Sequence, residues 1–220
     1  MPLTLFIGNK AYSSWSLRPW LLMRALDIPF AEEVTPLYVE GSREKMLHEA
    51  PTGKVPVLRD GDFAIWDSLA IVEYLAEKFP QNGVWPEDAQ ARARARSLCA
   101  EMHSGFQALR SACPTNFRRD RRETPLELEA GASADLARIE AIFTETPAQF
   151  SDGKNPFLFG EFCAADAYFA PIVCRLDVYA LPISPPARAY CDAVLALPAY
   201  HAWRAGAKAE EWVIDKWEGI

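Results

Sequence analysis

A serine-rich segment near the N-terminus is the first place in this sequence where residue types and spacing suggest chemistry. The segment contains Ser13, Ser14, Trp15, Ser16 and Arg18, and it lies between a predicted strand and a predicted helix. Unpaired N–H groups and the helix dipole favour an anion at such a helix start. Two interpretations remain open: the hydroxyls stabilise an oxyanion or thiolate, or one serine only caps the helix.

Two further motifs have residue types suited to holding a ligand. Pro56 follows Val55 at the start of a predicted strand, where a proline cannot donate a hydrogen bond to the sheet. A cis bond there would leave the backbone of Val55 free to pair with an extended ligand. Asp67 and Ser68 open a predicted helix. Asp67 either caps this helix or acts with Ser68 and the helix terminus to hold a ligand carboxylate.

These motifs fall among alternating strands and helices that we predict for the first 80 residues. Short apolar runs bounded by turn residues predict the strands, and helical spacing of apolar residues predicts the helices. The expected strands are 3–7, 33–36, 55–58 and 63–66, and the expected helices are 16–26, 42–49 and 67–78. The resulting order is βαβ–α–ββα.

The pattern changes after Pro80. Residues 81–87 have the composition of a linker. Beyond them, apolar stripes predict only helices, at 91–109, 126–146, from 163 onward, 186–195 and 198–208. We therefore expect a small α/β domain followed by an all-α domain, which agrees with a length of 220 residues.

Composition excludes several classes of protein. Half of the residues are hydrophobic and 24% are charged, which rules out a disordered chain. The net charge of −7 provides no basic surface for nucleic acid or for an anionic membrane. The five cysteines are an odd number without a CxxC spacing, which argues against a disulfide framework or a zinc ribbon. With neither a signal-peptide pattern nor a long apolar run, we expect a cytoplasmic protein with no membrane partner.

The order of these motifs resembles the cytosolic glutathione transferase superfamily over nearly the whole chain. The segment with Ser13, Ser14, Ser16 and Arg18 is similar to the active-site segment of the zeta class and related serine-type classes. Residues 54–58 and 67–75 are similar to the family's cis-proline loop and to its glutathione-carboxylate helix. Residues 160–171 are similar to a capped helix of the second domain.

The resemblance implies a fold, a domain organisation and an oligomeric state. The expected fold class is an α/β thioredoxin-like N-terminal domain followed by an all-α helical C-terminal domain. The expected boundaries are 1–80 for the glutathione-binding domain, 81–87 for the linker and 88–220 for the helical substrate-binding domain. The resemblance also implies a homodimer.

The resemblance further implies that glutathione is the co-substrate and that no metal is needed. We expect Ser13 to donate a hydrogen bond to the glutathione sulfur, with Ser14 as its backup. A free thiol is about 3% ionised at pH 7, and lowering its pKa from 8.5 to about 6.5 makes it roughly 76% ionised. This shift requires about 2.7 kcal/mol. A charge-assisted hydrogen bond of about 1.5–3 kcal/mol plus a helix terminus of about 0.3–1 kcal/mol could supply it.

The remaining expected contacts hold the rest of the tripeptide. Val55, beside Pro56, is expected to pair its backbone with the cysteinyl part of glutathione. Asp67 and Ser68 are expected to hold the γ-glutamyl end. Lys54 is expected to reach the ligand, and the alternative for it is a solvated lysine at a strand edge.

Three functions remain open from the sequence. The first is a transferase or peroxidase that activates glutathione for attack on a small hydrophobic electrophile. The second is a glutathione-dependent isomerase acting on maleylacetoacetate, and the third is a non-catalytic glutathione-transferase-like binding module. Intact Ser13, Pro56, Asp67 and Ser68 favour the first two. Trp15 stands where the zeta class has a cysteine, which argues against the isomerase.

Three features of the helical part carry separate hypotheses. Cys113 could approach the acceptor pocket, although most free cysteines are inert small hydrophobes. The basic run 118–122 could form an electropositive lip that draws in anionic acceptors, or it could be a solvated turn. Cys163 takes the place of the usual Ser or Thr in a capping box with Asp166, and we expect the thiol to weaken that half of the box.

Overall fold

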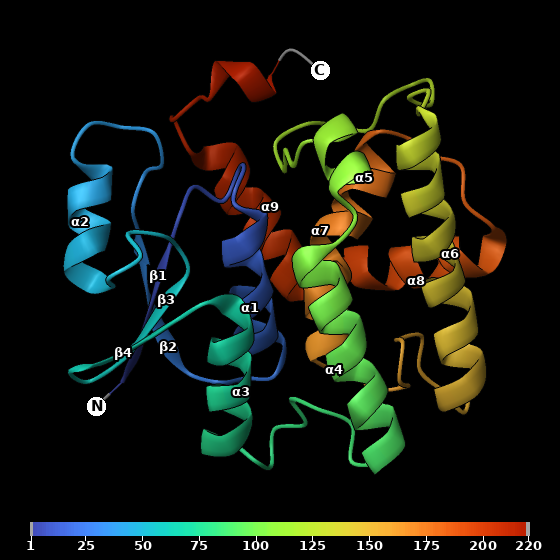
Figure 1. Ribbon diagram of the computed structural model, residues 1–220, viewed down its shortest axis with the longest axis horizontal. Helices are drawn as coiled ribbons and strands as arrows, with labels where there is room; N and C mark the ends of the chain where they lie inside the picture. The colour runs from blue at the N-terminus through green and yellow to red at the C-terminus, as the bar shows by residue number, and fades with distance from the viewer. Residues whose placement is uncertain (1, 219–220) are drawn as a thin grey trace.

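The computed structural model describes residues 2–218 of the chain. A small sheet with three helices forms one side of the molecule, and a group of helices forms the other (Figure 1). The sheet contains β1 (Leu3–Ile7), β2 (Phe30–Val34), β3 (Val57–Asp60) and β4 (Phe63–Trp66), in the order β2-β1-β3-β4. Strand β2 is parallel to β1, and β3 and β4 are antiparallel to their neighbours.

Helices cover both faces of this sheet. Leu3, Leu5 and Ile7 of β1 alternate toward the main core, which they share with α1 (Ser14–Ala25) and α3 (Ser68–Lys78). Helix α2 (Ser42–Glu49) covers the opposite face, where Met46 packs near Val57. The element order is the predicted βαβ–α–ββα, and the N-terminal part has the expected thioredoxin-like α/β fold.

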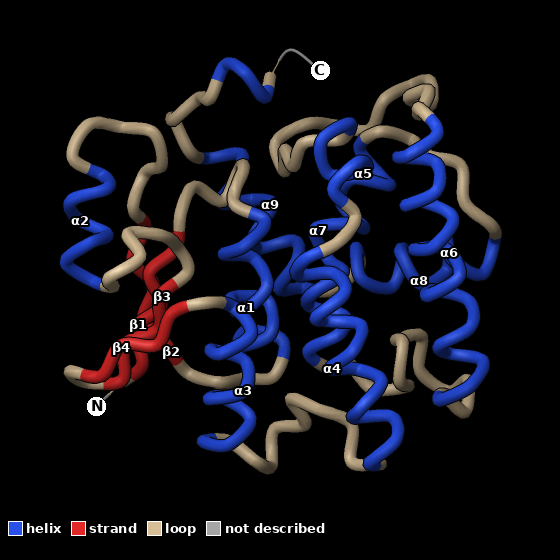
Figure 2. Tube along the Cα trace, viewed as in Figure 1, coloured by secondary structure: helices blue, strands red, loops and turns tan. Residues whose placement is uncertain are grey.

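The helical part surrounds one helix, α7 (Ala164–Val178), which is buried except at Asp177 and packs against α1 of the N-terminal part (Figure 2). The other helices are α4 (Ala89–Ser104), α5 (Gln107–Ala112), α6 (Ala130–Phe150), α8 (Pro185–Leu195) and α9 (Pro198–Ala209), with a short 3₁₀ turn η1 (Asp215–Trp217) near the C-terminus. None of the helices within residues 2–218 has the length and apolarity needed to cross a membrane. The predicted boundaries of the two domains stay a prediction.

Two strands differ from their predicted positions. Strand β2 begins earlier, at Phe30, directly after a proline, and pairs from Phe30 opposite Leu3. Strand β3 begins only at Val57, because Pro56 has no N–H to donate to the sheet. Val55 and Pro56 therefore belong to the loop that precedes the strand.

The predicted long helix over 91–109 is wrong, because the helix is interrupted between α4 and α5. A Cβ atom on Gly105 would lie 2.7 Å from the carbonyl oxygen of Glu101, so only glycine fits there. Phe106 then takes a left-handed conformation with φ of 59°. Met102, Phe106 and Leu109 are all buried nevertheless. The apolar stripe therefore continues across the interruption between the two helices.

Helix α6 also begins later than predicted. Leu126 and Leu128 pack against the core from a non-helical segment, and the Leu126 N–H donates to the carbonyl of Tyr179 at 3.0 Å. Burial of these two leucines explains why their spacing resembles that of a helix. The helix itself runs from Ala130 to Phe150.

Candidate functional site

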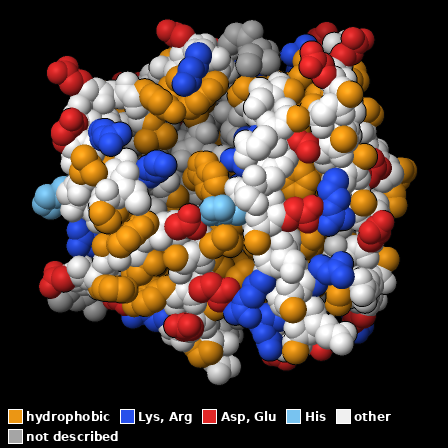
Figure 3. Space-filling model, in the orientation of Figure 1, with side chains coloured by type: hydrophobic (Ala, Val, Ile, Leu, Met, Phe, Trp, Pro, Cys, Tyr) orange, Lys and Arg blue, Asp and Glu red, His pale blue; other side chains and the backbone are white. Residues whose placement is uncertain are grey.

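A cleft of about 780 Å³ lies where the sheet domain meets the helical part. Its walls come from the β1–α1 loop, the loop before β3, α2, α5 and the C-terminal turn. A second pocket of about 370 Å³ reaches the start of α3 and shares Trp15, Lys54 and Val55 with the first. The two pockets are therefore adjacent, and we call them together the groove. Figure 3 shows the molecular surface hollowed between its two halves on this face.

Both predicted serines line the cleft at the start of α1. Ser13 is the N-cap, and its Oγ accepts a hydrogen bond from the Ser16 N–H at 3.3 Å. Its hydroxyl lies 2.8 Å from the Ser16 hydroxyl, which accepts from the Gly8 N–H at 3.0 Å. Ser14 is nearly buried and also lines the cleft. The capping and ligand-binding interpretations of Ser13 are therefore compatible, because the cap faces the cleft.

Trp15 is held in the groove by stacked cations. The Arg18 guanidinium is almost fully buried, 4.1 Å from the Trp15 ring centre and 5.0 Å from that of Tyr168. Burial lowers the pKa of Arg18 to about 10. The Arg110 guanidinium lies 5.2 Å from the Trp15 ring. These contacts fix the indole in the wall shared by the two pockets.

The predicted peptide-binding loop also lines the groove. The Val55–Pro56 bond is cis. Lys54 and Val55 line both pockets, whereas Pro56 lines only the smaller one. The structure thus brings this loop to the same groove as Ser13.

The start of α3 forms the far end of the smaller pocket. Asp67 caps the helix, because its Oδ1 accepts from the Leu69 N–H at 2.8 Å. Ser68 is buried, and its hydroxyl accepts from the Tyr168 hydroxyl at 2.9 Å. The Ser68 proton remains available to a ligand, since a hydroxyl can accept and donate at once. This end therefore offers a carboxylate, a hydroxyl and a helix N-terminus.

His103 is a residue of this site that the sequence analysis did not identify. Its Nε2 lies 3.4 Å from Asp67 Oδ2, and its ring meets the edge of Trp15 with centres 4.9 Å apart. Burial lowers the pKa of His103, although Asp67 acts in the opposite direction. Nothing in the local sequence marks this histidine, because only the packing of α4 beside α3 brings it to the groove.

Cys113 does not line the cleft. It is fully buried, and its carbonyl accepts a hydrogen bond from Nε of Arg175 at 2.8 Å. Burial raises the pKa of the Cys113 thiol to about 11. All five cysteines are buried and unpaired. The structure gives Cys113 a packing role.

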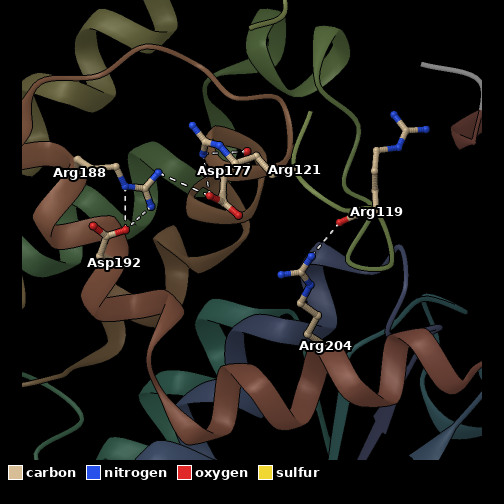
Figure 4. Close-up of polar contacts among 6 residues, drawn as sticks. All are labelled: Arg119, Arg121, Asp177, Arg188, Asp192 and Arg204. Carbon is tan, nitrogen blue, oxygen red and sulfur yellow. Dashed lines mark hydrogen bonds and ion pairs between the residues drawn. The ribbon is translucent and has the colours of Figure 1, made fainter. Parts of the chain in front are cut away.

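None of the residues of the basic run 118–122 is among those that line the cleft. Arg118 donates to the carbonyls of Glu210 and Trp212, which lie in the C-terminal segment. Arg121 pairs with Asp177 at 2.9 Å, and Arg204 donates to the carbonyl of Arg119 at 3.0 Å (Figure 4). These guanidinium groups hold chain segments together, and the lip hypothesis for this run stays a prediction.

The C-terminal segment that these arginines hold borders the cleft. Trp217 lines it and lies 5.5 Å from the Tyr12 ring and 5.4 Å from the Tyr38 ring, between ring centres. The Glu210 carboxylate accepts hydrogen bonds from the N–H groups of Lys10 and Ala11 at 2.6 and 2.9 Å. The segment is therefore attached to the same β1–α1 loop that carries Ser13.

Within residues 2–218, no three His, Cys, Asp or Glu side chains converge as metal ligands would. The chemistry available in the groove comes from hydroxyls, helix termini, cations and one Asp–His pair.

Comparisons with known proteins agree with this geometry. Residues 12–78 match the family model described as glutathione S-transferase, N-terminal domain. Glutathione S-transferase 1 of Dianthus caryophyllus is 35% identical over 113 residues, so the match covers about half of each chain. Maleylacetoacetate isomerase of Rattus norvegicus is 28% identical over 87% of each chain.

Solved structures show the same fold. A glutathione transferase homolog from Burkholderia, solved with bound glutathione, superposes with a TM-score of 0.70 at 24% identity. The match covers 96% of this chain and all of that one. The two-part architecture, a thioredoxin-like sheet domain with a helical domain, is thus that of known glutathione transferases.

Proposed function

We propose that this chain, as a member of the cytosolic glutathione transferase superfamily, binds glutathione as its co-substrate and activates the glutathione thiol as a thiolate for attack on a small hydrophobic electrophile. One observation carries the proposal. Ser13 and Ser14 line the larger cleft, the α3 terminus at Asp67 lines the adjacent smaller pocket, and Val55 lines both.

The groove has the donors needed to hold a thiolate. A hydroxyl proton rotates freely, so Ser16 can donate to Ser13 once a sulfur accepts the Ser13 proton. The chain would then run from the Gly8 N–H through Ser16 and Ser13 to the sulfur, over contacts of 3.0 and 2.8 Å. Hydrogen bonds in such a chain polarise one another. The positive end of the α1 dipole acts in the same direction.

The rest of the tripeptide matches the groove in charge. Asp67 can accept the glutamyl ammonium, and Ser68 with the α3 N-terminus can bind the glutamyl carboxylate. The free backbone groups of Val55 can pair with the cysteinyl residue, and Lys54 can reach the glycyl carboxylate. In the reaction the thiolate forms a C–S bond with the electrophilic carbon, and the leaving group departs with its bonding electrons.

The test measures glutathione binding and thiol ionisation separately. Calorimetry should show glutathione binding that collapses in the double variant Asp67→Ala, Ser68→Ala. In Ser13→Ala, binding should persist while the thiolate absorbance at neutral pH falls and turnover drops by about tenfold or more. Arg121→Gln, far from the groove, is the matched control. Unchanged thiol ionisation and turnover in Ser13→Ala would contradict the role of Ser13.

A second function has one specific observation in its favour. The rat relative that matches over 87% of both chains is a maleylacetoacetate isomerase. An isomerase would use the same thiolate to add to a double bond and then leave it. Trp15 in the groove wall argues against this function, and a panel of aryl halides, peroxides and maleylacetoacetate would separate the two.

We also propose a homodimer. Phe63 of the edge strand β4 is 63% exposed, which is unusual for a large apolar side chain at a sheet edge. Light scattering in solution tests this by giving the mass of the particle.

A further inference from the structure

The larger cleft is positively charged, although the protein as a whole carries a net charge of −7. Its described lining contains four cationic side chains, Arg43, Lys54, Arg110 and Arg175, and no aspartate or glutamate. Within residues 2–218, none of the four takes part in an ion pair. Such a concentration of unpaired cations in a cleft attracts an anion.

Glutathione accounts for only part of this charge. Its glycyl carboxylate can be held by Lys54 and Arg43, which lie on the sheet-domain side of the cleft. Its glutamyl end belongs at the α3 terminus, in the smaller pocket. Arg110 and Arg175 come from α5 and α7, on the helical side (Figure 1). They are left without a partner in glutathione.

Arg175 is built into this wall as a fixed donor. It is 5% exposed, and its Nε and Nη1 donate to the carbonyls of Cys113 at 2.8 Å and Pro171 at 3.0 Å. Within the described residues its Nη2 has no hydrogen-bond acceptor, and the residue lines the cleft. The pKa of Arg175 is lowered to about 10, chiefly by burial, and the nearby charge of Arg110 acts in the same direction. An anion between the two guanidinium groups would relieve both effects.

Thr115 gives an independent sign of a missing ligand at the same place. Its side chain lines the cleft and is 5% exposed. Its Oγ1 is buried and has no hydrogen-bond partner within residues 2–218. Buried hydroxyls normally have a partner, so a ligand at this wall would supply one once the Thr115 side chain turns toward the cleft.

We infer that the second substrate carries a carboxylate, bound by Arg110 and Arg175 with Thr115, while its apolar body lies toward Trp15. This inference rests on the proposed function, because it concerns the electrophile that the glutathione thiolate attacks. A carboxylate held at the helical wall would direct the opposite end of the acceptor toward Ser13. Two guanidinium donors also match the two oxygens of a carboxylate.

The test compares two glutathione conjugates, one with a free carboxylate and one in which a methyl ester removes the negative charge of that group. One is made chemically from para-chloro-meta-nitrobenzoate and the other from its methyl ester. In each, the thiolate forms a C–S bond with the carbon that bears chlorine, chloride leaves with the bonding electrons, and the thiol proton passes to the buffer. Calorimetry then measures the affinity of the protein for glutathione and for each conjugate, so the test does not require turnover.

The wild-type protein should bind the carboxylate conjugate about tenfold or more tightly than the ester conjugate. Arg110→Gln should reduce this preference to about threefold or less, whereas Arg110→Lys should keep most of it. Because Arg175 also holds two backbone carbonyls, the test does not depend on a variant at that position. Arg121→Gln, which lies outside the cleft, should leave the preference unchanged.

The outcomes separate this inference from the proposed function. If glutathione and the ester conjugate bind but the carboxylate is not preferred, or if Arg110→Gln keeps the preference, the inference is wrong and the proposed function stands. If glutathione binds and neither conjugate does, the inference is also wrong. If neither glutathione nor a conjugate binds, the proposed function fails together with it.

Discussion

At the scale of single residues, the fully buried hydroxyl of Ser16 controls which way the Ser13 proton can point. Ser16 accepts from the Gly8 N–H at 3.0 Å and lies 2.8 Å from the Ser13 hydroxyl. In the free protein the Ser13 hydroxyl donates its hydrogen bond to the Ser16 hydroxyl. With a thiolate bound, Ser16 can reverse this bond and leave the Ser13 proton for the sulfur. Ser16 is therefore expected to be a positioning residue.

The Ser16→Ala variant tests this role. We expect the pKa of the bound glutathione thiol to rise by about half to one pH unit, because Ser13 loses the bond that polarises it. Glutathione affinity should change little, since Ser16 does not line the groove. Titrating the thiolate absorbance of the complex gives the pKa. A thiol pKa that matches the wild type in a folded Ser16→Ala protein would rule the relay out.

At the scale of elements, the start of α7 shows how a buried carboxylate organises a helix. Asp166 accepts from the N–H groups of Cys163 at 2.9 Å and Leu158 at 3.1 Å. Both halves of the capping box with Cys163 form, so the expected weakening by the thiol does not prevent the reciprocal arrangement. Because α7 packs directly against α1, this cap supports the helix that carries Ser13.

Asp166 should also make stability depend on pH. Burial raises the pKa of Asp166 from 3.8 to about 6. The folded protein then holds this proton more tightly than the unfolded chain, so the contribution of Asp166 to stability is largest below about pH 4 and declines as pH rises to about 6.

The comparison with Asp166→Asn isolates this effect from other carboxylates. Each carboxylate oxygen of Asp166 accepts one buried N–H, and the asparagine keeps only one of these two oxygens. The variant should therefore be less stable than the wild type at every pH. Its deficit relative to wild type should shrink by about 2 kcal/mol between about pH 4 and neutral pH, which is most of the free energy equivalent to the shift in pKa from 3.8 to about 6. Denaturant unfolding of both proteins at both pH values measures this difference in the free energy of unfolding. A deficit independent of pH would contradict the raised pKa.

At the scale of the whole molecule, the two parts share one continuous core. Trp20 of α1 packs against Trp203 of α9 with ring centres 5.1 Å apart, and Tyr168 of α7 donates to Ser68 of α3. Most buried apolar residues of both parts belong to one cluster, and only Met46, Ala50 and Val57 form a second one among the described residues. The groove is therefore held open between surfaces that fold together.

This shared core predicts a single cooperative unfolding transition. Tryptophan fluorescence and far-ultraviolet circular dichroism should give the same denaturant midpoint, because neither part can lose its packing alone. If a dimer forms, both midpoints should shift together with protein concentration. Two separated transitions would show that the parts unfold independently.

The amino-acid sequence by itself determined most of the elements and the local parts of the site. Helix starts at Ser13 and Asp67 can be predicted because caps depend on a few neighbouring residues. The same holds for Pro56, whose missing N–H keeps it outside the strand. All of these residues reach the groove in the structure, and their roles in binding and catalysis stay predictions.

Only the tertiary structure decided the other wall of the site. His103, Arg110 and Arg175 come from three helices of the second part, and their local sequences resemble ordinary helix surfaces or cores. The break at Gly105 depends on a close approach to one backbone carbonyl, which no apolar periodicity reveals. The charge of the cleft is likewise a property of surfaces that meet only after folding. Contacts between distant segments, which local residue patterns do not encode, set these features.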